Sequence, residues 1–502
     1  MNDRNDYTLI TNGLVLGPDA RDALPADILV KDGEIVEIGP YALAAPESAQ
    51  VLDATDRLII PGLVNAHTHG HGALCKGVGD RWTLELLLNA GAWIAANRSV
   101  EHKYLSALIG AGEMLLKGCT AAYDLYVEIP IPSVEGMNAV GQAYRDAGMR
   151  AVVAPMLADR TFFEAMPALL DALPAACQPQ VSKLRMAPYS ETVAIARQLL
   201  SSWALDREWV RPALGPTIPL HCSDDYLMAM HQLANEYAVG LHTHLGESKI
   251  QALAGCERYG KTLTAHLDEL GFVGSNFTAA HAVWLDSDDI QRLADAGASV
   301  AHNPGSNMRL GSGIAPIREM LDAGVNVGIG TDGAHCADNQ NMFEAMRLGS
   351  FVSRIRSHDV EKWVGTDEAS RLATVGSAQA LGLGDKIGRI APGFKADLVL
   401  LDLAHVNWIP LSDAVNQLVH TEDGTGVDTV MVGGEIMVDR GQLVNLDMNK
   451  LKEDAKDAIS TISPMNHETR RLAEQLECHL GQFCMGLSAT PYRVRAMAGE
   501  AH

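Results

Sequence analysis

Two histidines separated by one residue, His67 and His69, follow a short apolar run with the character of a buried strand. Residues i and i+2 of a strand point to the same side, so both imidazoles can converge on one point. His244, His281 and Asp332 each close a further apolar strand candidate. Any one of them alone is also compatible with a polar loop residue, but burying the whole set without partners would be costly. The set therefore predicts a shared divalent cation, and imidazole with carboxylate suits both zinc and ferrous iron.

These residues need a scaffold that brings strand ends together. Strand and helix patterns alternate over residues 61–387, which predicts parallel βαβ units and, from the length, a (β/α)8 barrel. The active site of such a barrel lies at the carboxyl ends of its strands, where the five residues stand. Residues 1–60 and 388–446 show short alternating strands instead, and we expect them to complete one small β domain. Residues 447–502 are predicted to form a C-terminal helical extension.

Composition narrows the class of protein. The chain has 502 residues, 47% of them hydrophobic, and a net charge of −23. So acidic a surface repels phosphates and anionic lipids, and we expect neither nucleic acid nor membrane as a partner. The sequence shows no apolar stretch of membrane-spanning length and no basic segment followed by an apolar run, so we expect no secretory signal. Its eight cysteines include no CxxC pair, which favours reduced thiols and a cytoplasmic location.

Several motifs around the histidines resemble one known family. They are PGLVNAHTH at 61–69, LHTHLGES at 241–248, TAAHAVWL at 278–285, HNPGSNMRLGSG at 302–313, GIGTDGA at 328–334 and IGRIAPGFKADLVLLD at 387–402. Over about residues 7–445, and in the same order, the chain resembles the amidohydrolase superfamily, in its branch of mononuclear-metal deaminases and s-triazine hydrolases. This resemblance implies an α/β fold with a distorted (β/α)8 barrel and a small β-sandwich built from both chain ends.

The resemblance also implies a role for each of the five residues. His67, His69, His244 and Asp332 match direct metal ligands, and His281 matches a histidine that either binds the metal or orients its water. No lysine stands where one would bridge two metals, so we expect one divalent ion per subunit, with zinc favoured and iron as the alternative.

Glu247, three residues after His244, matches the proton shuttle of the family. Taken alone, it has the character of an exposed acid at the start of a helix. The implied chemistry begins with water, whose pKa a divalent metal lowers towards about 7. Asp332 then accepts a proton and Glu247 protonates a ring nitrogen, which allows the leaving group to depart.

The substrate is less strongly indicated. Thr217 stands where nucleoside-deaminating relatives carry a histidine, and residues 79–86 do not align with their acidic residue and tryptophan, which counts against an adenosine-like substrate. Cys336 resembles a cysteine that accompanies deamination in triazine hydrolases, although Gly333 replaces the aspartate that goes with it, and a small buried thiol explains it equally well. The candidates for substrate contact, by position alone, are His71, Trp82, Arg150, Thr217, His302, Asn303, Ser306, His335 and Cys336. For Arg150 a structural role is the alternative.

The sequence therefore predicts a metal-dependent hydrolase that replaces an exocyclic amine of an N-heteroaromatic compound, of purine, pterin, pyrimidine or triazine type, with a carbonyl and releases ammonia. One alternative is hydrolysis of a cyclic amide, urea or halide on a similar ring. Another is a non-catalytic binding or assembly barrel, against which the retained ligands and Glu247 argue. The helical extension and the habit of the family favour a homo-oligomer, either a dimer or a tetramer.

Overall fold

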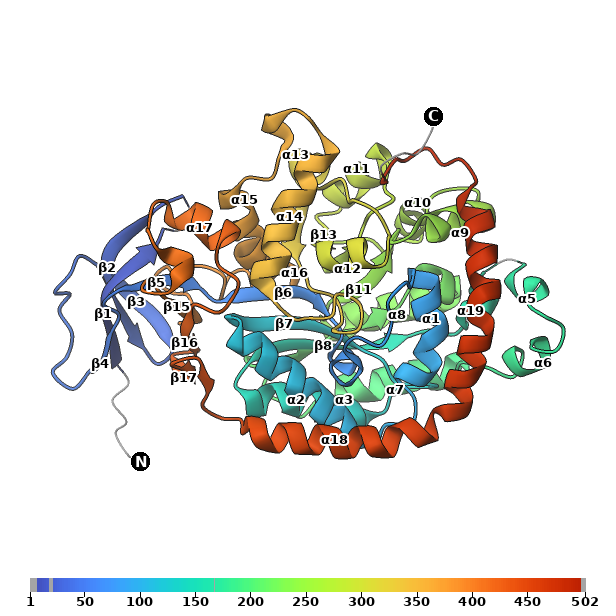
Figure 1. Ribbon diagram of the computed structural model, residues 1–502, viewed down its shortest axis with the longest axis horizontal. Coiled ribbons are helices and arrows are strands. Elements are labelled where there is room, and N and C mark those ends of the chain that lie inside the picture. The colour runs from blue at the N-terminus through green and yellow to red at the C-terminus, as the bar shows by residue number, and fades with distance from the viewer. Residues whose placement is uncertain (1–6, 18–20, 167, 498–502) are drawn as a thin grey trace.

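A ring of parallel strands lies at the centre of the computed structural model, which describes residues 7–17, 21–166 and 168–497 (Figure 1). The ring consists, in order, of β6 (Leu63–Thr68), β7 (Cys119–Tyr126), β8 (Arg150–Leu157), β9 and β10 (Val210–Pro212 and Gly215–Pro216), β11 (Leu241–Leu245), β12 (Phe277–His281), β13 (Ser299–His302) and β14 (Asn326–Ile329). Hydrogen bonds divide these strands into two sheets, β10-β8-β7-β6 with β9 beside β8, and β11-β12-β13-β14.

The two sheets join at both sides to form the ring. A parallel bridge between Leu214 and Leu241 connects one side. On the other side, the Asp332 N–H donates to the His67 carbonyl at 2.9 Å. With β9 and β10 sharing the fourth position, the strands follow the order of a (β/α)8 barrel.

Helices surround the ring, and its strands are buried on both faces, as parallel strands usually are. Every position of β6, β7, β11 and β12 is buried. The helices are α1 (Leu84–Ile94), α2 (Val100–Leu116), α3 (Val134–Ala147), α4 (Phe162–Ala165), α5 (Leu169–Ala172), α6 (Gln178–Val181), α7 (Tyr189–Ser201), α8 (Asp224–Tyr237), α9 (Lys249–Tyr259), α10 (Leu263–Glu269), α11 (Ser287–Asp295), α12 (Pro304–Arg309), α13 (Ile317–Asp322), α14 (Met342–Arg356), α15 (Thr366–Arg371) and α16 (Ser377–Ala380). Local capping sets their ends: α3 follows Ser133, whose side chain accepts the Gly136 N–H, and stops at Gly148, where φ is 79°.

Strands from both parts of the chain pair in a small β domain beside the barrel, on the left of Figure 1. The strands are β1 (Tyr7–Leu16), β2 (Ala23–Lys31), β3 (Glu34–Gly39), β4 (Gln50–Asp53), β5 (Arg57–Pro61), β15 (Leu398–Asp402), β16 (Val427–Val432), β17 (Glu435–Asp439) and β18 (Gln442–Leu443). They form one sheet in the order β18-β17-β16-β15-β5-β1-β2-β3, with β4 beside β1, while α17 (Ala414–His420) lies between β15 and β16 in the chain. In the antiparallel pair of β5 and β15, Ile60 lies opposite Val399.

The apolar run 58–64 has the character of a single strand in the sequence, but the structure divides it between the two domains. β5 ends before Gly62, and β6 begins after it. The Gly62 N–H donates to the Asp397 carbonyl at 2.8 Å, and a Cβ on Gly62 would lie 2.2 Å from Thr120 Oγ1. The chain can pass from one sheet to the other here because glycine has no side chain.

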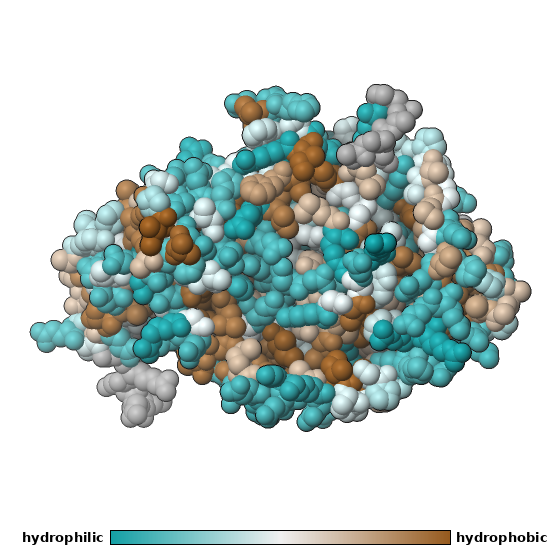
Figure 2. Space-filling view, in the orientation of Figure 1, coloured by the Kyte–Doolittle hydropathy of each residue, from teal (hydrophilic) through white to brown (hydrophobic). Residues whose placement is uncertain are grey.

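The last part of the described chain forms two long helices, α18 (Met448–Met465) and α19 (His467–Ser488), along the lower and right edges of Figure 1. α18 buries Leu451, Ala458 and Ile462, whereas the side chains along the lower edge of Figure 2 are mainly hydrophilic. α19 runs beside α1. Within the described ranges, no helix has the length and apolar character needed to cross a bilayer.

Candidate metal centre and active site

Four histidines and one aspartate meet at the carboxyl ends of four ring strands. His67 lies in β6 and His69 directly follows it, while His244 lies in β11, His281 ends β12 and Asp332 follows β14. The Asp332 Oδ1 lies 3.1 Å from His69 Nε2 and 3.6 Å from His67 Nε2, and its Oδ2 lies 3.9 Å from His281 Nε2. Donor atoms of His67, His69 and His244, and likewise of His67, His281 and Asp332, lie within 4.8 Å of one another. The structure thus brings together all five predicted ligands.

The hydrogen positions on two imidazoles fit a bound cation. His69 Nδ1 lies 2.6 Å from the Leu125 carbonyl oxygen, and His244 Nδ1 lies 2.5 Å from that of Thr217. A carbonyl oxygen only accepts, so each Nδ1 carries the hydrogen and each Nε2 of a neutral ring presents a lone pair. These Nε2 atoms face each other at 3.2 Å, an arrangement that a shared cation stabilises. Neither ring nitrogen of buried His67 has a hydrogen-bond partner among the described residues, which also suits a ligand.

Asp332 is held through both its carboxylate and its backbone. The Gly333 N–H donates to Oδ1 at 2.7 Å, and the Ser306 hydroxyl donates to Oδ2 at 2.6 Å. The Gln340 side-chain amide donates to the Asp332 carbonyl at 2.8 Å, which supports a left-handed backbone with φ of 62°. Burial raises the pKa of Asp332, but the neighbouring imidazoles of His67 and His69 outweigh that effect and hold the pKa well below 3.8. The carboxylate is therefore ionised and available to accept a proton.

Glu247, in contrast, keeps its proton. Its Oε2 lies 3.6 Å from His281 Nε2, and its side chain is buried. Burial raises the pKa of Glu247 well above 4.5, and the nearby carboxylates of Asp332 and Glu85 raise it further. Glu247 is thus protonated at a pH where an exposed glutamate has ionised, which is the state required of a proton donor. Burial lowers the pKa of His281, whose Nδ1 lies 2.9 Å from Asn307 Oδ1.

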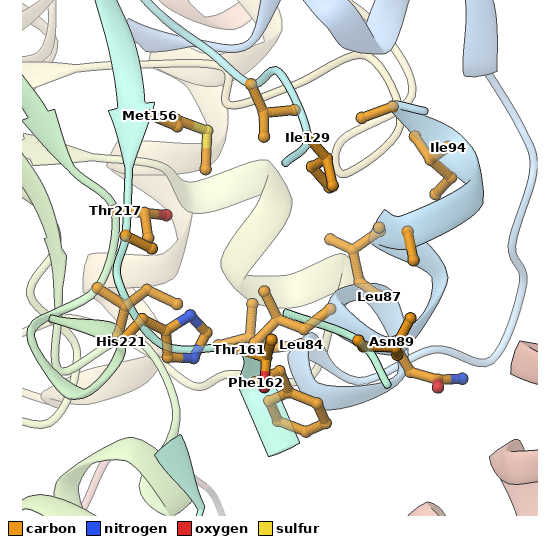
Figure 3. A pocket seen from close by; sticks show the side chains of 18 of the residues that line it. Leu84, Leu87, Asn89, Ile94, Ile129, Met156, Thr161, Phe162, Thr217 and His221 are labelled. Carbon is orange, nitrogen blue, oxygen red and sulfur yellow. The ribbon is translucent and has the colours of Figure 1, made fainter. Parts of the chain in front are cut away.

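A cavity of about 250 Å³ opens on this cluster, and Figure 3 shows part of its lining, including Met156, Phe162 and Thr217. Its polar end includes, besides metal-centre residues and Glu247, the predicted substrate contacts His71, Thr217, His335 and Cys336. The other walls are mainly apolar and include Leu84, Leu87, Leu88, Ile94, Ile129, Met156, Phe162, Phe163, Leu184, Met186, Leu472 and Leu476. Apolar walls with a few converging polar groups are typical of a small-molecule site.

The additional polar groups at this end of the cavity are neutral. Burial lowers the pKa of both His71 and His335, and that of His335 falls to about 3. Their ring centroids lie 4.9 Å apart, and each Nδ1 lacks a hydrogen-bond partner among the described residues. Burial raises the pKa of the Cys336 thiol well above 9.0, so it stays protonated. These side chains offer a ligand hydrogen-bonding atoms without a formal charge.

Five predicted substrate contacts lie outside the cavity lining, among them Asn303, which is buried directly after β13. Arg150 is corrected: it begins β8, at the end of the strand opposite to the metal centre, and its Nε lies 2.8 Å from Oδ2 of buried Asp397. This buried ion pair supports the structural alternative for Arg150. Ser306 bonds to the carboxylate of the metal centre, as described above, and His302 is buried in β13. Trp82 packs against an apolar cluster that includes Leu87.

Sequence reasoning missed most of the cavity wall. Most of the missing residues lie on α1, on the segments 158–163 and 184–186, and on α19. The only local signal is helical spacing, as between Leu472 and Leu476 on α19. Ordinary core packing produces the same spacing, so this signal does not identify a cavity.

Imidazole and carboxylate ligands at the strand ends of a parallel barrel, beside a protonated glutamate, define a metal-dependent hydrolase. A family model described as the amidohydrolase family matches residues 58–437. The chain belongs to the amidohydrolase family, and it is a hydrolase acting on carbon–nitrogen bonds. This finding confirms both the resemblance seen in the motifs and the barrel-type α/β fold.

Relatives of known sequence and structure agree with this family. The 5′-deoxyadenosine deaminase of Methanobrevibacter smithii is 31% identical over 456 residues, which are 90% of this chain and 98% of the relative. The 5-methylthioadenosine/S-adenosylhomocysteine deaminase of Thermococcus onnurineus is 34% identical over 436 residues, 86% of this chain and 94% of the relative. The zinc-bound adenosine deaminase structure from Xanthomonas campestris has a TM-score of 0.80 at 28% identity, and covers 91% of this chain and 98% of its own. The zinc complex of atrazine chlorohydrolase TrzN from Arthrobacter aurescens has a TM-score of 0.81 at 27% identity, with 90% and 100% covered.

Proposed function

We propose that this chain binds one zinc ion per subunit and hydrolytically deaminates the adenine ring of a nucleoside. The observation that carries the proposal is the buried carboxyl group of Glu247, 3.6 Å from His281 in the histidine–aspartate cluster, at the polar end of an apolar cavity. Relatives named as deaminases of 5′-deoxyadenosine and 5-methylthioadenosine support the substrate class. They weigh against the prediction, made from Thr217 and residues 79–86, that an adenosine-like substrate is disfavoured. Zinc is supported by its presence in two similar structures and by the imidazole-rich ligand set.

The reaction is hydrolytic deamination, and the protein residues move the protons. When bound, the divalent ion supplies Lewis-acid activation of water. Asp332 accepts the first proton of that water, and Glu247 gives its proton to the ring nitrogen beside the carbon that carries the amine. The water oxygen adds to this carbon, which the protonated nitrogen has made more electrophilic. The carbon–nitrogen bond then breaks as Asp332 passes its proton to the amine and ammonia leaves. The added hydroxyl gives its remaining proton to the ionised Glu247, so that a ring carbonyl remains and Glu247 is protonated again.

We assign His71, Thr217, His335 and Cys336 as substrate contacts because they line the cavity next to the metal centre. Being neutral, the two imidazoles and the thiol suit an uncharged heterocycle. The apolar walls behind them keep bulk water away from the ring, which strengthens the hydrogen bonds that are made there.

Release of ammonia from a panel of compounds tests the proposal. The panel contains adenosine, 5′-deoxyadenosine, 5′-methylthioadenosine, and an amino- and a chloro-substituted s-triazine, with ammonia and chloride assayed separately. We expect ammonia from at least one nucleoside. The Glu247→Gln variant, which keeps the size of the side chain and all metal ligands, is expected to reduce kcat/KM by about 10²–10⁴-fold. Chloride release or ring opening without ammonia would overturn the deaminase assignment, and full activity of metal-free protein would overturn the role of zinc.

A further inference from the structure

One wall of the cavity lies between two helices that are far apart in the sequence. α1 contributes Leu84, Leu87 and Leu88, and α19 contributes Leu472 and Leu476. On each helix these residues are three or four positions apart, so they share one face. Figure 1 shows α19 running beside α1, and Figure 3 shows Leu84 and Leu87 on the cavity side of α1. The two helices therefore present apolar faces to the same space.

Specific hydrogen bonds fix α19 against α1. The buried side-chain amide of Asn89, on α1, donates to the Ala473 carbonyl of α19 at 2.9 Å. At the start of α19, the Asn466 side-chain amide donates to the Ala96 carbonyl at 3.0 Å, and Asn97 donates to Asn466 Oδ1 at 2.7 Å. Because these bonds involve backbone carbonyls on both sides, they set the separation and register of the two helices. α19 is thus held in a fixed position as part of the cavity wall.

This wall distinguishes apolar from hydroxylated groups. Leu84, Leu87, Leu472 and Leu476 offer only carbon atoms, so a hydroxyl placed among them loses its hydrogen bonds to water without replacement. A methyl or thioether group in the same place gains from leaving water. A substituent of the substrate that reaches this wall therefore meets carbon atoms of α1 and α19.

We propose that α19 forms a specificity subsite with α1, which selects substrates whose substituent at this wall is an alkyl or thioether group and not a hydroxylated one. This inference rests on the proposed function and names the substrate class more narrowly. Leu476, buried on the cavity face of α19, is its central residue, and Leu472 lies one turn before it. Both act on substrate choice, without a part in proton transfer.

A ratio of two activities measures this selectivity. 5′-Methylthioadenosine and adenosine share ring and ribose and differ in an apolar against a hydroxyl group at the 5′ position. We expect wild type to prefer the thioether, and Leu476→Asn to lower the ratio of the two kcat/KM values by about tenfold or more, the effect of one mismatched group in a fitted pocket. The control is Leu480→Asn, one turn further along α19, which is equally buried but outside the cavity lining. Its ratio should stay within twofold of wild type.

The ratio is taken within one enzyme preparation, so partial unfolding of a variant cancels. If Leu476→Asn does not fold, Leu472→Gln, at a half-buried position, serves in its place. An active wild type whose ratio is unchanged by both variants, or changed equally by Leu480→Asn, overturns the subsite while leaving the deaminase intact. If wild type converts neither nucleoside, the proposed substrate class is wrong, and an N-ethyl and N-(2-hydroxyethyl) pair of amino-s-triazines decides the subsite by the same ratio. Inactivity on both pairs overturns both proposals.

Discussion

Replacing Arg150 by methionine separates a structural role of this arginine from a role in substrate binding. Its guanidinium contacts Asp397 through Nε–Oδ2 at 2.8 Å and Nη2–Oδ1 at 3.3 Å, and the side chains are 4% and 1% exposed. Removing one member of such a buried pair leaves the other charge uncompensated and typically costs about 3–5 kcal/mol. Asp397 keeps one hydrogen bond in the variant, from the Gly433 N–H at 2.7 Å. We therefore expect the free energy of unfolding to fall by about 3 kcal/mol, the lower end of that range.

Two measurements on the same samples test this expectation. Urea unfolding followed by circular dichroism gives the stability, and ammonia release well below the unfolding midpoint gives kcat/KM, which we expect within twofold of wild type. The matched control is Arg211→Met on the adjacent strand β9, where a half-buried arginine bonds the Gly382 carbonyl at 3.0 Å. That change should cost less than about 1 kcal/mol, close to other surface substitutions.

The double variant Arg150→Met/Asp397→Leu removes both charges and should regain most of the lost stability, because it leaves no uncompensated carboxylate. The reasoning is refuted if Arg150→Met unfolds at the same urea concentration as wild type and instead raises KM. That pattern is expected of a substrate contact.

Three further predictions concern the metal centre and its surroundings. Ser306→Ala removes one hydrogen bond to the ionised Asp332 carboxylate, which is worth about 1.5–3 kcal/mol. We therefore expect kcat/KM to fall by about 10–150-fold while the metal content stays unchanged. Loss of metal in proportion to activity would contradict this. Burial raises the pKa of Asp124 to about 6, although the Gly70 N–H and the Tyr144 hydroxyl donate to it. Since an unfolded aspartate titrates near about 3.9, the native state favours the protonated form, and this group lowers the free energy of unfolding by about 3 kcal/mol as the pH rises from about 4 to about 6. Asp124→Asn should remove that part of the slope in unfolding experiments against pH, and an unchanged slope would refute the assignment. Removing the metal with a chelator should abolish ammonia release. It should also remove the stabilisation that bound zinc provides, about 4 kcal/mol at a zinc concentration about 1,000-fold above its Kd, and added zinc should restore both. A chelated enzyme that keeps its melting temperature would show that the cluster binds no ion.

The metal ligands could be predicted from the sequence because the evidence for each is local. His67, His244, His281 and Asp332 all stand at the carboxyl ends of apolar segments, and parallel strand ends meet in one place whatever the detailed packing. Arg150 is predicted as a substrate contact with a structural role as the alternative, and its place two residues after the Gly148 cap of α3 puts it at the start of its strand. The direction of the strand therefore favours the structural role of Arg150.

The apolar wall could not be predicted, because its residues meet only through tertiary packing. Leu476 reaches the cavity because Asn89 and Asn466 fix α19 against α1, and neither contact is visible as a local pattern. Ser306 is a similar case, because a serine on a short helix gives no sign that it bonds a carboxylate on another strand. The homo-oligomeric state and the cytoplasmic location stay predictions.

The pairing of β5 with β15 has a consequence for synthesis of the chain. The two strands are about 340 residues apart, so at about 5–20 residues per second the ribosome makes the second about 20–70 s after the first. During this time one edge of β5, with the apolar Leu58, Ile59 and Ile60, has no partner strand. An exposed apolar edge is a site for aggregation. The yield of native protein should therefore depend on chaperones that shield the nascent N-terminal strands until translation reaches the last fifth of the chain.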